Sequence, residues 1–373
     1  MTTAYSGDGI TFPDNSVQAT APRVGMVNRI INGDMRIDQR NGGASTSVQT
    51  SSDYVTCDRW HVAASQNSKF TIGQNLGAVT SAVGFSNYLG ASSSSAFSVA
   101  ASDYFLIGHK IEGFNSADLL WGTANAQSVT LSFKVYSSLT GTFGGSVLNS
   151  AQNRSYPFTY TVSSANTWTN ISVTIAGDTS GTWIGATNGT GLRFYFSLGA
   201  GSSVSGTAGA WGGAFYGSAT GAVSVVGTSG ATFYVTGVQL EKGSTATDFE
   251  YVDYGRQLQQ CQRYFYYSQY GGMGAGANSQ NLFMMIPLPT VMRTTPDVAL
   301  KSGVITASDI YASGYATSTA TPVVMSTSGT GPVTVTVSIR NGWSPGINTG
   351  RPLFFGANTT PAADGAFLIS AEL

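Results

Sequence analysis

The sequence predicts an all-β protein in four parts: a short N-terminal arm, a jelly-roll β-sandwich, a short connector helix and a smaller C-terminal β domain. Apolar and polar residues alternate with period two in segment after segment, which is typical of half-buried strands. Clusters of Gly, Ser, Asn and Thr separate these segments, and only one short segment has helical spacing. The predicted parts span residues 1–22, 23–252, 253–270 and 271–373.

The arm, residues 1–22, has the pattern of a strand, a Pro-Asp-Asn turn and a second strand. A two-stranded unit of this size is not stable alone in water, so it needs a partner. We expect Ile10, Phe12 and Val17 to make that attachment.

The region 23–252 contains strand after strand with no long helical segment. The clearest alternating runs are 128–136, 170–175, 192–198 and 231–236. Alternation of this kind places one face on a core and the other in solvent, as in antiparallel sandwiches. About 230 residues without crossover helices favour a jelly-roll sandwich.

The connector, 253–270, breaks this pattern. Leu258, Cys261 and Phe265 recur at spacings of three and four, which places them on one face of a short helix. The apolar stripe is narrow. This face either packs on the preceding sandwich of the same chain or forms a bundle with the same helix of two sister copies.

The region 271–373 becomes strand-like again, through 282–286, 333–339 and 367–369. Its Gly-, Ser- and Thr-rich composition predicts a second, smaller β domain, distal to the arm. No fixed-period repeat is visible, which argues against a solenoid or a long β-helix shaft.

Composition excludes several functional classes. Charged residues make up 9% of the chain, against about 25% in an ordinary soluble domain. The formal net charge is −1, so the electrostatic basis for binding nucleic acid or anionic membranes is missing. The N-terminus is polar and has no apolar stretch typical of a secretory signal, and no segment is apolar enough to insert in a membrane. Cys57 and Cys261 are predicted to be free thiols.

The sequence predicts no catalytic residue, no metal site and no cofactor. His61 and His109 are the only histidines, and no motif with metal-ligand spacing is present. A polysaccharide-cleaving enzyme needs two carboxylates facing a cleft. The closest pairs in sequence are Asp103/Glu112, Asp248/Glu250 and Glu250/Asp253, and a position at a helix start suffices to explain the last pair. A Ca²⁺ ion bound by backbone carbonyls and scattered Asp side chains stays open.

Aromatic residues are the better indication of a binding function. Sugar rings stack their C–H groups on aromatic faces, and their hydroxyl groups take neutral hydrogen bonds from Asn, Gln, Ser and Thr. A chain poor in charge and rich in those residues suits neutral glycans. The candidate glycan-binding residues are Trp121, Trp183, Trp211 and Trp343, with core packing as the alternative for each.

Five segments carry a family resemblance. They are ITFPDNSVQATA at 10–21, NRIINGDMRIDQR at 28–40 with DRW at 58–60, VQLEKGSTATDFE at 238–250, CQRYF at 261–265 and SAEL at 370–373. In amino-acid sequence and in their order along the chain, these segments resemble bacteriophage tail-fibre or receptor-binding proteins that contain a carbohydrate-binding-module-like sandwich. The resemblance also implies a turn at Gly33 and Asp34, a core position for Trp60 and a strand-end hydrogen bond for Glu241.

The resemblance implies a homotrimeric virion appendage, made in the host cytoplasm, that binds host-surface polysaccharide. Its partners would be two identical chains, another virion protein that receives the arm, and the host glycan, with no nucleic acid and no membrane insertion. The short arm leaves open whether the chain attaches to a tail protein, to another fibre or to the head. The alternatives are a head fibre or capsid decoration protein without a receptor, a polysaccharide depolymerase and a bacterial carbohydrate-binding module.

Overall fold

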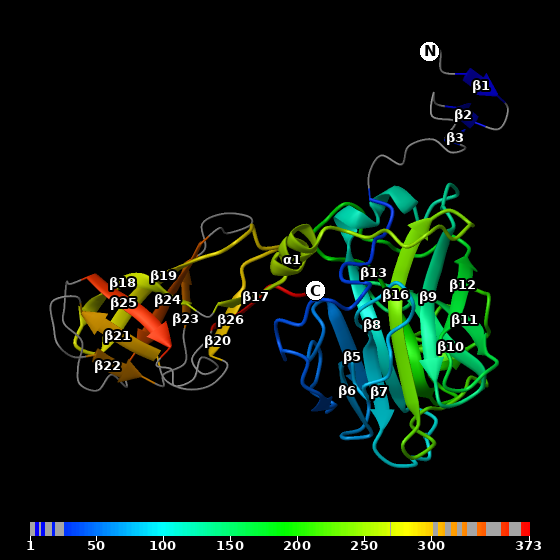
Figure 1. Ribbon diagram of the computed structural model, residues 1–373, viewed down its shortest axis with the longest axis horizontal. Coiled ribbons are helices and arrows are strands. Elements are labelled where there is room, and N and C mark those ends of the chain that lie inside the picture. Colours follow the sequence, from blue (N-terminus) through cyan, green and yellow to red (C-terminus); the bar gives the residue numbers. More distant parts are fainter. Residues whose placement is uncertain are drawn as a thin grey trace.

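The computed structural model describes residues 4–6, 9–11, 17–18, 26–268, 270–300, 305–309, 315–318, 323–326, 334–340, 352–357 and 367–373. The predicted all-β class is confirmed: two main antiparallel sheets form a sandwich, which is followed by one short α-helix and smaller C-terminal sheets (Figure 1). No helix in the described part of the chain is long and apolar enough to cross a membrane.

The arm contains the predicted strand pair and one strand more. β1 (Ala4–Ser6), β2 (Gly9–Thr11) and β3 (Val17–Gln18) form an antiparallel sheet in that order. Ile10 lies opposite Gln18, and Thr11 lies opposite Val17. Phe12 lies outside the described residues, so the attachment role of the arm stays a prediction.

The sandwich consists of a five-stranded and a six-stranded sheet, both antiparallel. The five-stranded sheet has the order β11 (Ser155–Val162), β10 (Gly141–Asn149), β13 (Thr190–Ala200), β8 (Tyr104–Glu112), β5 (Trp60–Ala64). The six-stranded sheet has the order β12 (Thr169–Ile175), β9 (Val129–Ser137), β16 (Thr232–Lys242), β7 (Leu89–Ser93), β6 (Phe70–Gln74), β4 (Thr46–Ser47). The four strands predicted from alternation are β9, β12, β13 and β16.

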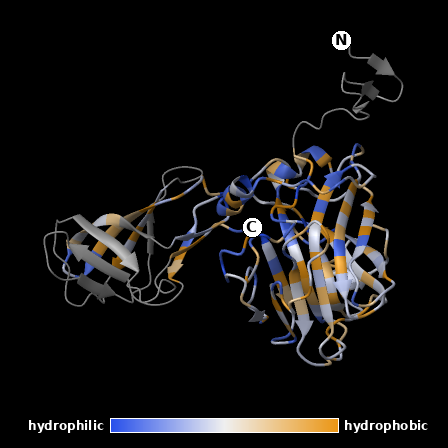
Figure 2. Ribbon diagram, viewed as in Figure 1, coloured by the Kyte–Doolittle hydropathy of each residue, from blue (hydrophilic) through white to orange (hydrophobic). Residues whose placement is uncertain are grey.

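Short elements complete the sandwich. Two 3₁₀ turns, Gly113–Asn115 and Ala117–Leu119, follow β8, and β14 (Ser205–Gly206) pairs in parallel with β15 (Ser218–Ala219). Hydrophobic residues alternate with polar ones along the long strands, as Figure 2 shows. The inward-facing residues of both sheets form one core, centred on aromatic rings.

Trp60 is part of this core, as predicted. Its side chain is 1% exposed, and its ring packs edge-on against Phe194 at 5.8 Å. The indole Nε1 donates to the carbonyl oxygen of Asn32 at 3.0 Å, so the buried N–H has a partner.

The two ends of the sandwich sequence meet in space. The predicted turn is present at 31–34, and Gly33 has no room for a side chain, because a Cβ there would lie 2.1 Å from the carbonyl oxygen of Val238. The side chain of Asn28 bonds both the Val238 carbonyl and the Leu240 amide. Glu241 accepts hydrogen bonds from Thr247, which confirms the predicted strand-end role.

Helix α1 (Tyr254–Gln262) is shorter than predicted. Asp253 caps its start by accepting from the Arg256 amide, and Cys261 and Gln257 form its buried face. Leu258 is only half-buried, and Phe265 belongs to strand β17 (Phe265–Ser268), because the backbone there pairs with Ser370 instead of continuing the helix. Gln257 donates to Asp34 at 3.2 Å, so this face packs on the sandwich of its own chain.

The C-terminal part forms two sheets. The first has the order β17, β26 (Phe367–Ser370), β20 (Asp297–Leu300). The second has the order β22 (Tyr315–Ser318), β21 (Ile305–Asp309), β25 (Pro352–Ala357), β18 (Tyr270–Asn278), β19 (Asn281–Pro287), β24 (Thr334–Arg340), β23 (Val323–Ser326). The predicted strands 282–286, 333–339 and 367–369 correspond to β19, β24 and β26. A second apolar core lies beneath them.

Candidate functional site: a groove on the five-stranded sheet

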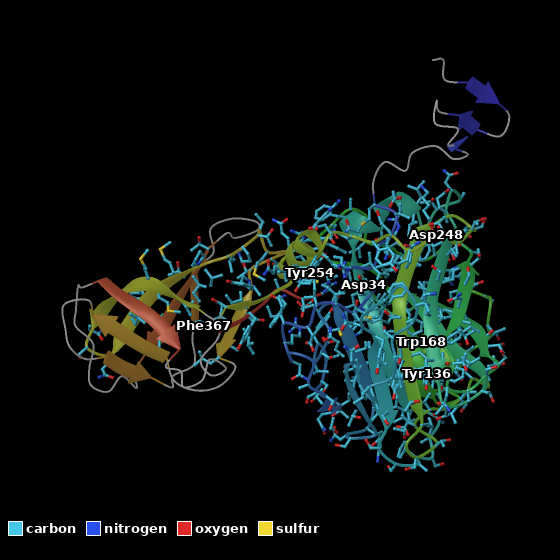
Figure 3. All side chains as sticks on the ribbon, viewed as in Figure 1. Asp34, Tyr136, Trp168, Asp248, Tyr254 and Phe367 are labelled. Atoms are coloured by element: carbon cyan, nitrogen blue, oxygen red, sulfur yellow. The ribbon has the colours of Figure 1, made fainter. Side chains whose placement is uncertain are left out.

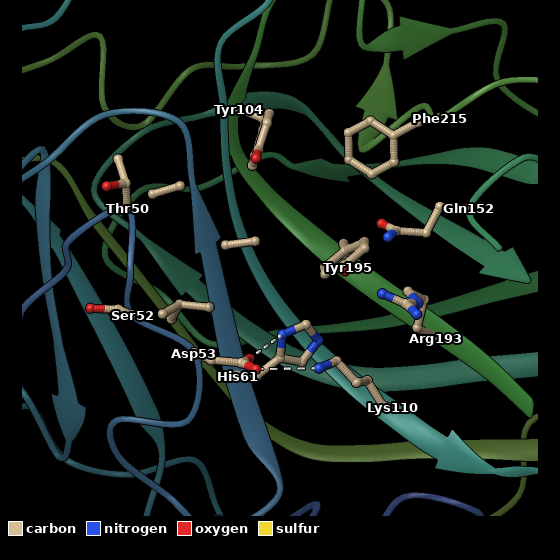
Figure 4. A pocket seen from close by; sticks show the side chains of 13 residues that line it. Thr50, Ser52, Asp53, His61, Tyr104, Lys110, Gln152, Arg193, Tyr195 and Phe215 are labelled. Carbon is tan, nitrogen blue, oxygen red and sulfur yellow. Dashed lines mark hydrogen bonds and ion pairs between the residues drawn. The ribbon is translucent and has the colours of Figure 1, made fainter. Parts of the chain in front are cut away.

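A groove of about 510 Å³ crosses the outer face of the five-stranded sheet, the face turned away from the core. Its floor comes from β5, β8 and β13, and its walls come from the loops that carry Asp53, Gln152 and Phe215 (Figure 4). The strands supply a fixed base, while the loops place side chains around it.

The floor depends on a missing side chain at Gly108. In the strand register, Gly108 of β8 lies between His61 of β5 and Tyr195 of β13. A Cβ at this position would lie 2.5 Å from the Tyr195 ring and 2.7 Å from the carbonyl oxygen of Phe194. Because glycine leaves this space free, the rings of His61 and Tyr195 meet across the strand at 5.3 Å.

Apolar and aromatic side chains line one end of the groove. Leu106, Leu148 and Tyr195 form a small buried cluster separate from the main core, and Tyr104 and Phe215 cover it. The rings of Tyr104 and Phe215 pack edge to face at 5.7 Å, and both are partly exposed. They therefore offer aromatic surface to a ligand in the groove.

A polar group lies at the other end. His61 Nδ1 is 3.3 Å from one oxygen of Asp53, and Lys110 Nζ is 3.4 Å from the other (Figure 4). Burial lowers the pKa of His61 to about 4, so the imidazole is neutral at pH 7. Burial alone would raise the pKa of Asp53, but the hydrogen bond and charge interactions with His61 and Lys110 outweigh it and lower that pKa.

Arg193 stands beside this group, directly opposite Lys110 in the register of β13 and β8. Its Nη2 donates to the carbonyl oxygen of Ser150 at 3.0 Å, while its Nε is buried and has no hydrogen-bond partner. No carboxylate of the described residues lies within ion-pair distance of this guanidinium group.

Three of the four predicted tryptophans come together elsewhere, near one end of the sandwich. The ring of Trp121 lies 4.8 Å from that of Trp183 and 5.4 Å from that of Trp211, in edge-to-face contacts. All three pack against the main core, and each indole N–H already donates within the chain. Trp343 lies outside the described residues. Glycan binding by these tryptophans stays a prediction.

Another aromatic surface lies on the outer face of the six-stranded sheet. Tyr136 and Trp168 are neighbours there (Figure 3), with ring centroids 5.5 Å apart. Tyr136 also stacks on Tyr234 at 5.4 Å. The Trp168 indole donates to the carbonyl oxygen of Thr80, so its N–H is already satisfied within the chain.

Two of the carboxylates considered as catalytic candidates line a second cavity, of about 400 Å³, between the sandwich and α1. Glu112 accepts from Arg263 at 2.7 and 3.2 Å and from the Tyr264 hydroxyl at 2.6 Å. Glu250 accepts from the Asn28 amide at 2.6 Å. The partners of Glu112 join the sandwich to the connector, whereas Glu250 bonds a residue at the other end of the sandwich sequence.

Two of the remaining carboxylate candidates, Asp103 and Asp253, have structural partners as well, while Asp248 lines a different cavity, on the six-stranded sheet. Asp103 is 4% exposed and accepts from Ser65, Gln66 and the Ala100 amide. Asp253 caps α1, which confirms the helix-start explanation for this residue, whereas Glu250 precedes the cap and bonds Asn28 instead. Among the residues that the structure describes, no three or more His, Cys, Asp or Glu side chains gather in a way that could hold a metal ion.

The histidines and cysteines occupy packed positions. His109 is 1% exposed, faces the core and has its Nε2 3.1 Å from the Ile31 carbonyl oxygen. Cys57 and Cys261 are both buried and free, as predicted. Burial raises the pKa of both thiols well above the ordinary value, so neither is a ready nucleophile.

Sequence reasoning missed the groove residues because they come from three strands that become neighbours only in the fold. One signal was available. Arg193 and Tyr195 occupy the alternate positions of a predicted strand whose other positions are apolar, so both had to face away from the core.

No protein-family model matches the chain, and no curated protein matches it. Solved structures do. The enzymatically active domain of tailspike protein 4 from bacteriophage CBA120 has 10% identity and a TM-score of 0.30, over 58% of this chain and 21% of that chain.

In each of two further matches, the aligned region covers nearly the whole of the matched protein. A putative sugar binding protein from Bacteroides thetaiotaomicron has 11% identity and a TM-score of 0.31, over 58% of this chain and 99% of that one. A family 11 carbohydrate-binding module from Clostridium thermocellum, in complex with a β-1,3-1,4-mixed-linked tetrasaccharide, has 11% identity and a TM-score of 0.27, over 55% and 100%. The enzymatic and sugar-binding activities that these names state belong to the three matched proteins themselves.

Proposed function

We propose that this chain is a bacteriophage virion fibre protein that binds host-surface glycan through the groove on its five-stranded sheet. The groove carries this proposal. It combines the two partly exposed rings of Tyr104 and Phe215 with hydrogen-bonding groups on Asp53, Gln152 and Arg193. A sugar needs both kinds of surface, one for its C–H face and one for its hydroxyl groups.

The order of the five fibre-like segments supports the virion assignment. In this assignment three copies of the chain form a homotrimer, the arm inserts into another virion protein, and the appendage stands on the tail or the head. Three weak glycan sites per fibre, multiplied by several fibres per particle, then give firm attachment without new contacts. The chain binds and does not cleave its glycan.

Binding to a panel of immobilised bacterial surface polysaccharides tests the groove. We expect the purified chain to bind at least one polymer, and the double variant Tyr104→Ala, Phe215→Ala to lose at least about tenfold in affinity, as expected for aromatic anchors. Tyr254→Ala removes an exposed ring on α1, 53% exposed, and serves as the matched control. Equal affinity of the double variant and the wild type would contradict the proposal.

The cavity between the sandwich and α1 favours one alternative, a polysaccharide depolymerase, because it brings Glu112 and Glu250 together. Glu112 receives three hydrogen bonds from Arg263 and Tyr264, so its carboxylate already has a structural role in holding the connector to the sandwich. The test is release of reducing ends from the bound polysaccharide. We expect none. Release that disappears in Glu112→Gln or Glu250→Gln would establish the alternative.

A further inference from the structure

Most of the arginine side chains that the structure describes have carboxylate partners. Six of them form ion pairs with Asp or Glu: Arg29, Arg36, Arg40, Arg59, Arg154 and Arg263. Arg193, Arg256 and Arg293 have no such partner among the described residues, and of these three Arg193 lines the groove. A guanidinium group has five N–H donors, and Nη2 of Arg193 donates to the Ser150 carbonyl oxygen, so the group retains donors for a carboxylate.

The other charges of the groove are already paired. Asp53 interacts with both His61 and Lys110, and Lys110 also donates to the main-chain oxygen of Leu373 at 2.6 Å. Arg193 is therefore the cation of the groove lining that has no anionic side chain beside it among the described residues. An unpaired guanidinium group in a groove favours an anionic ligand.

His61 supplies a second, independent sign of a ligand. Its side chain is 2% exposed and lines the groove, and its Nε2 has no hydrogen-bond partner. Because Nδ1 faces the Asp53 carboxylate, the proton of the neutral ring lies on Nδ1, and Nε2 is an acceptor. A buried acceptor without a donor is costly, and a sugar hydroxyl would satisfy it.

We propose that the groove takes an acidic polysaccharide, with the carboxylate of a uronic acid unit on Arg193 and a sugar hydroxyl on His61 Nε2. This inference rests on the proposed function and narrows its substrate class. It departs from the neutral glycan that the composition of the whole chain predicts, because Arg193 places an unpaired positive charge in the groove.

Titration calorimetry with polygalacturonate, alginate and hyaluronate tests the inference, each polymer being compared with its carboxyl-reduced, neutral form. We expect at least one acidic polymer to bind at least about tenfold more tightly than its reduced form. Arg193→Gln should abolish that difference. Arg193→Lys, which keeps the charge but not the planar fork, should restore only part of it.

Arg256→Gln is the matched control, because it removes an exposed arginine outside the groove and should bind as the wild type does. A thermal melt of each variant verifies that it is folded. If reduced polymers bind as tightly as acidic ones, or Arg193→Gln keeps full preference, the inference fails while the proposed function stands. Binding to none of the acidic polymers also overturns it. The panel experiment with the Tyr104→Ala, Phe215→Ala variant decides the proposed function separately.

Discussion

The side chain of Asn32 satisfies three backbone groups at the start of the sandwich. Its amide donates to the carbonyl oxygens of Ile37 at 2.8 Å and Asp58 at 3.0 Å, and its oxygen accepts from the Ile37 amide at 3.0 Å. Asn32 is fully buried and has a φ of 60°, a region that Asn adopts more readily than most residues. The turn that the resemblance places at Gly33 and Asp34 therefore depends on its neighbour.

Asn32→Ala should lower the free energy of unfolding by about 3 kcal/mol, because it leaves buried polar groups unpaired. Denaturant unfolding measures this loss. Asn166→Ala is the control, since Asn166 has a φ of 56° but an exposed side chain. Similar losses in the two variants would show that backbone conformation, and not the hydrogen bonds, is the cause.

His61 predicts a pH dependence of stability. Its pKa falls from 6.5 to about 4 on folding because the ring is buried. The unfolded chain therefore takes up this proton first as the pH falls, so the contribution is complete above pH 6.5 and is lost as the pH falls toward 4. We expect the free energy of unfolding of the wild type to fall by about 3 kcal/mol over this pH range, and we expect no such fall in His61→Gln. An imidazole NMR titration midpoint near 6.5 in the folded protein would contradict this account.

At the scale of elements, strand β26 and the residues after it join the C-terminal sheets to the sandwich. Glu372 forms ion pairs with Arg40 and Arg59. The Arg59 guanidinium also lies 3.7 Å from the centre of the Tyr264 ring, and that of Arg40 lies 3.6 Å from the Phe265 ring. Three of the five segments that carry the family resemblance, 28–40 with 58–60, 261–265 and 370–373, thus meet at one buried cluster of ion pairs and cation–π contacts.

Glu372→Gln should destabilise the protein by about 3 kcal/mol, because it leaves Arg59, 1% exposed, without its charge partner. Its thermal midpoint should fall, and the C-terminal sheets should become more accessible to protease. Asp297→Asn, an exposed change in β20, should leave both measurements unchanged. A Glu372→Gln variant as stable as Asp297→Asn would rule out this role.

An element could be predicted from the sequence where the residues that determine it lie within one segment. Alternation within one segment is enough to predict strands such as β9 and β13. The end of α1 was missed because Phe265 fits helical spacing and yet is drawn into pairing with β26, which is about a hundred residues away. The groove was missed for the same reason, since Gly108 is informative only when β5 and β13 are known to flank it.

At the scale of the whole molecule, we expect three chains to associate. The buried face of α1 is already occupied by its own sandwich, so the arm and the C-terminal sheets are the parts we expect to make the contacts. Light scattering at micromolar concentration should give three times the chain mass of 38.7 kDa. A monomer mass would contradict the trimer, and it would leave glycan binding by a single groove unaffected.

A crystal structure of the chain with an oligosaccharide from a polymer that it binds tests the central claim most directly. The account predicts sugar density on the outer face of the five-stranded sheet, over Tyr104 and Phe215 and reaching Arg193. Sugar bound instead beside Trp121 and Trp183, or on the C-terminal sheets, with the groove empty, would contradict it.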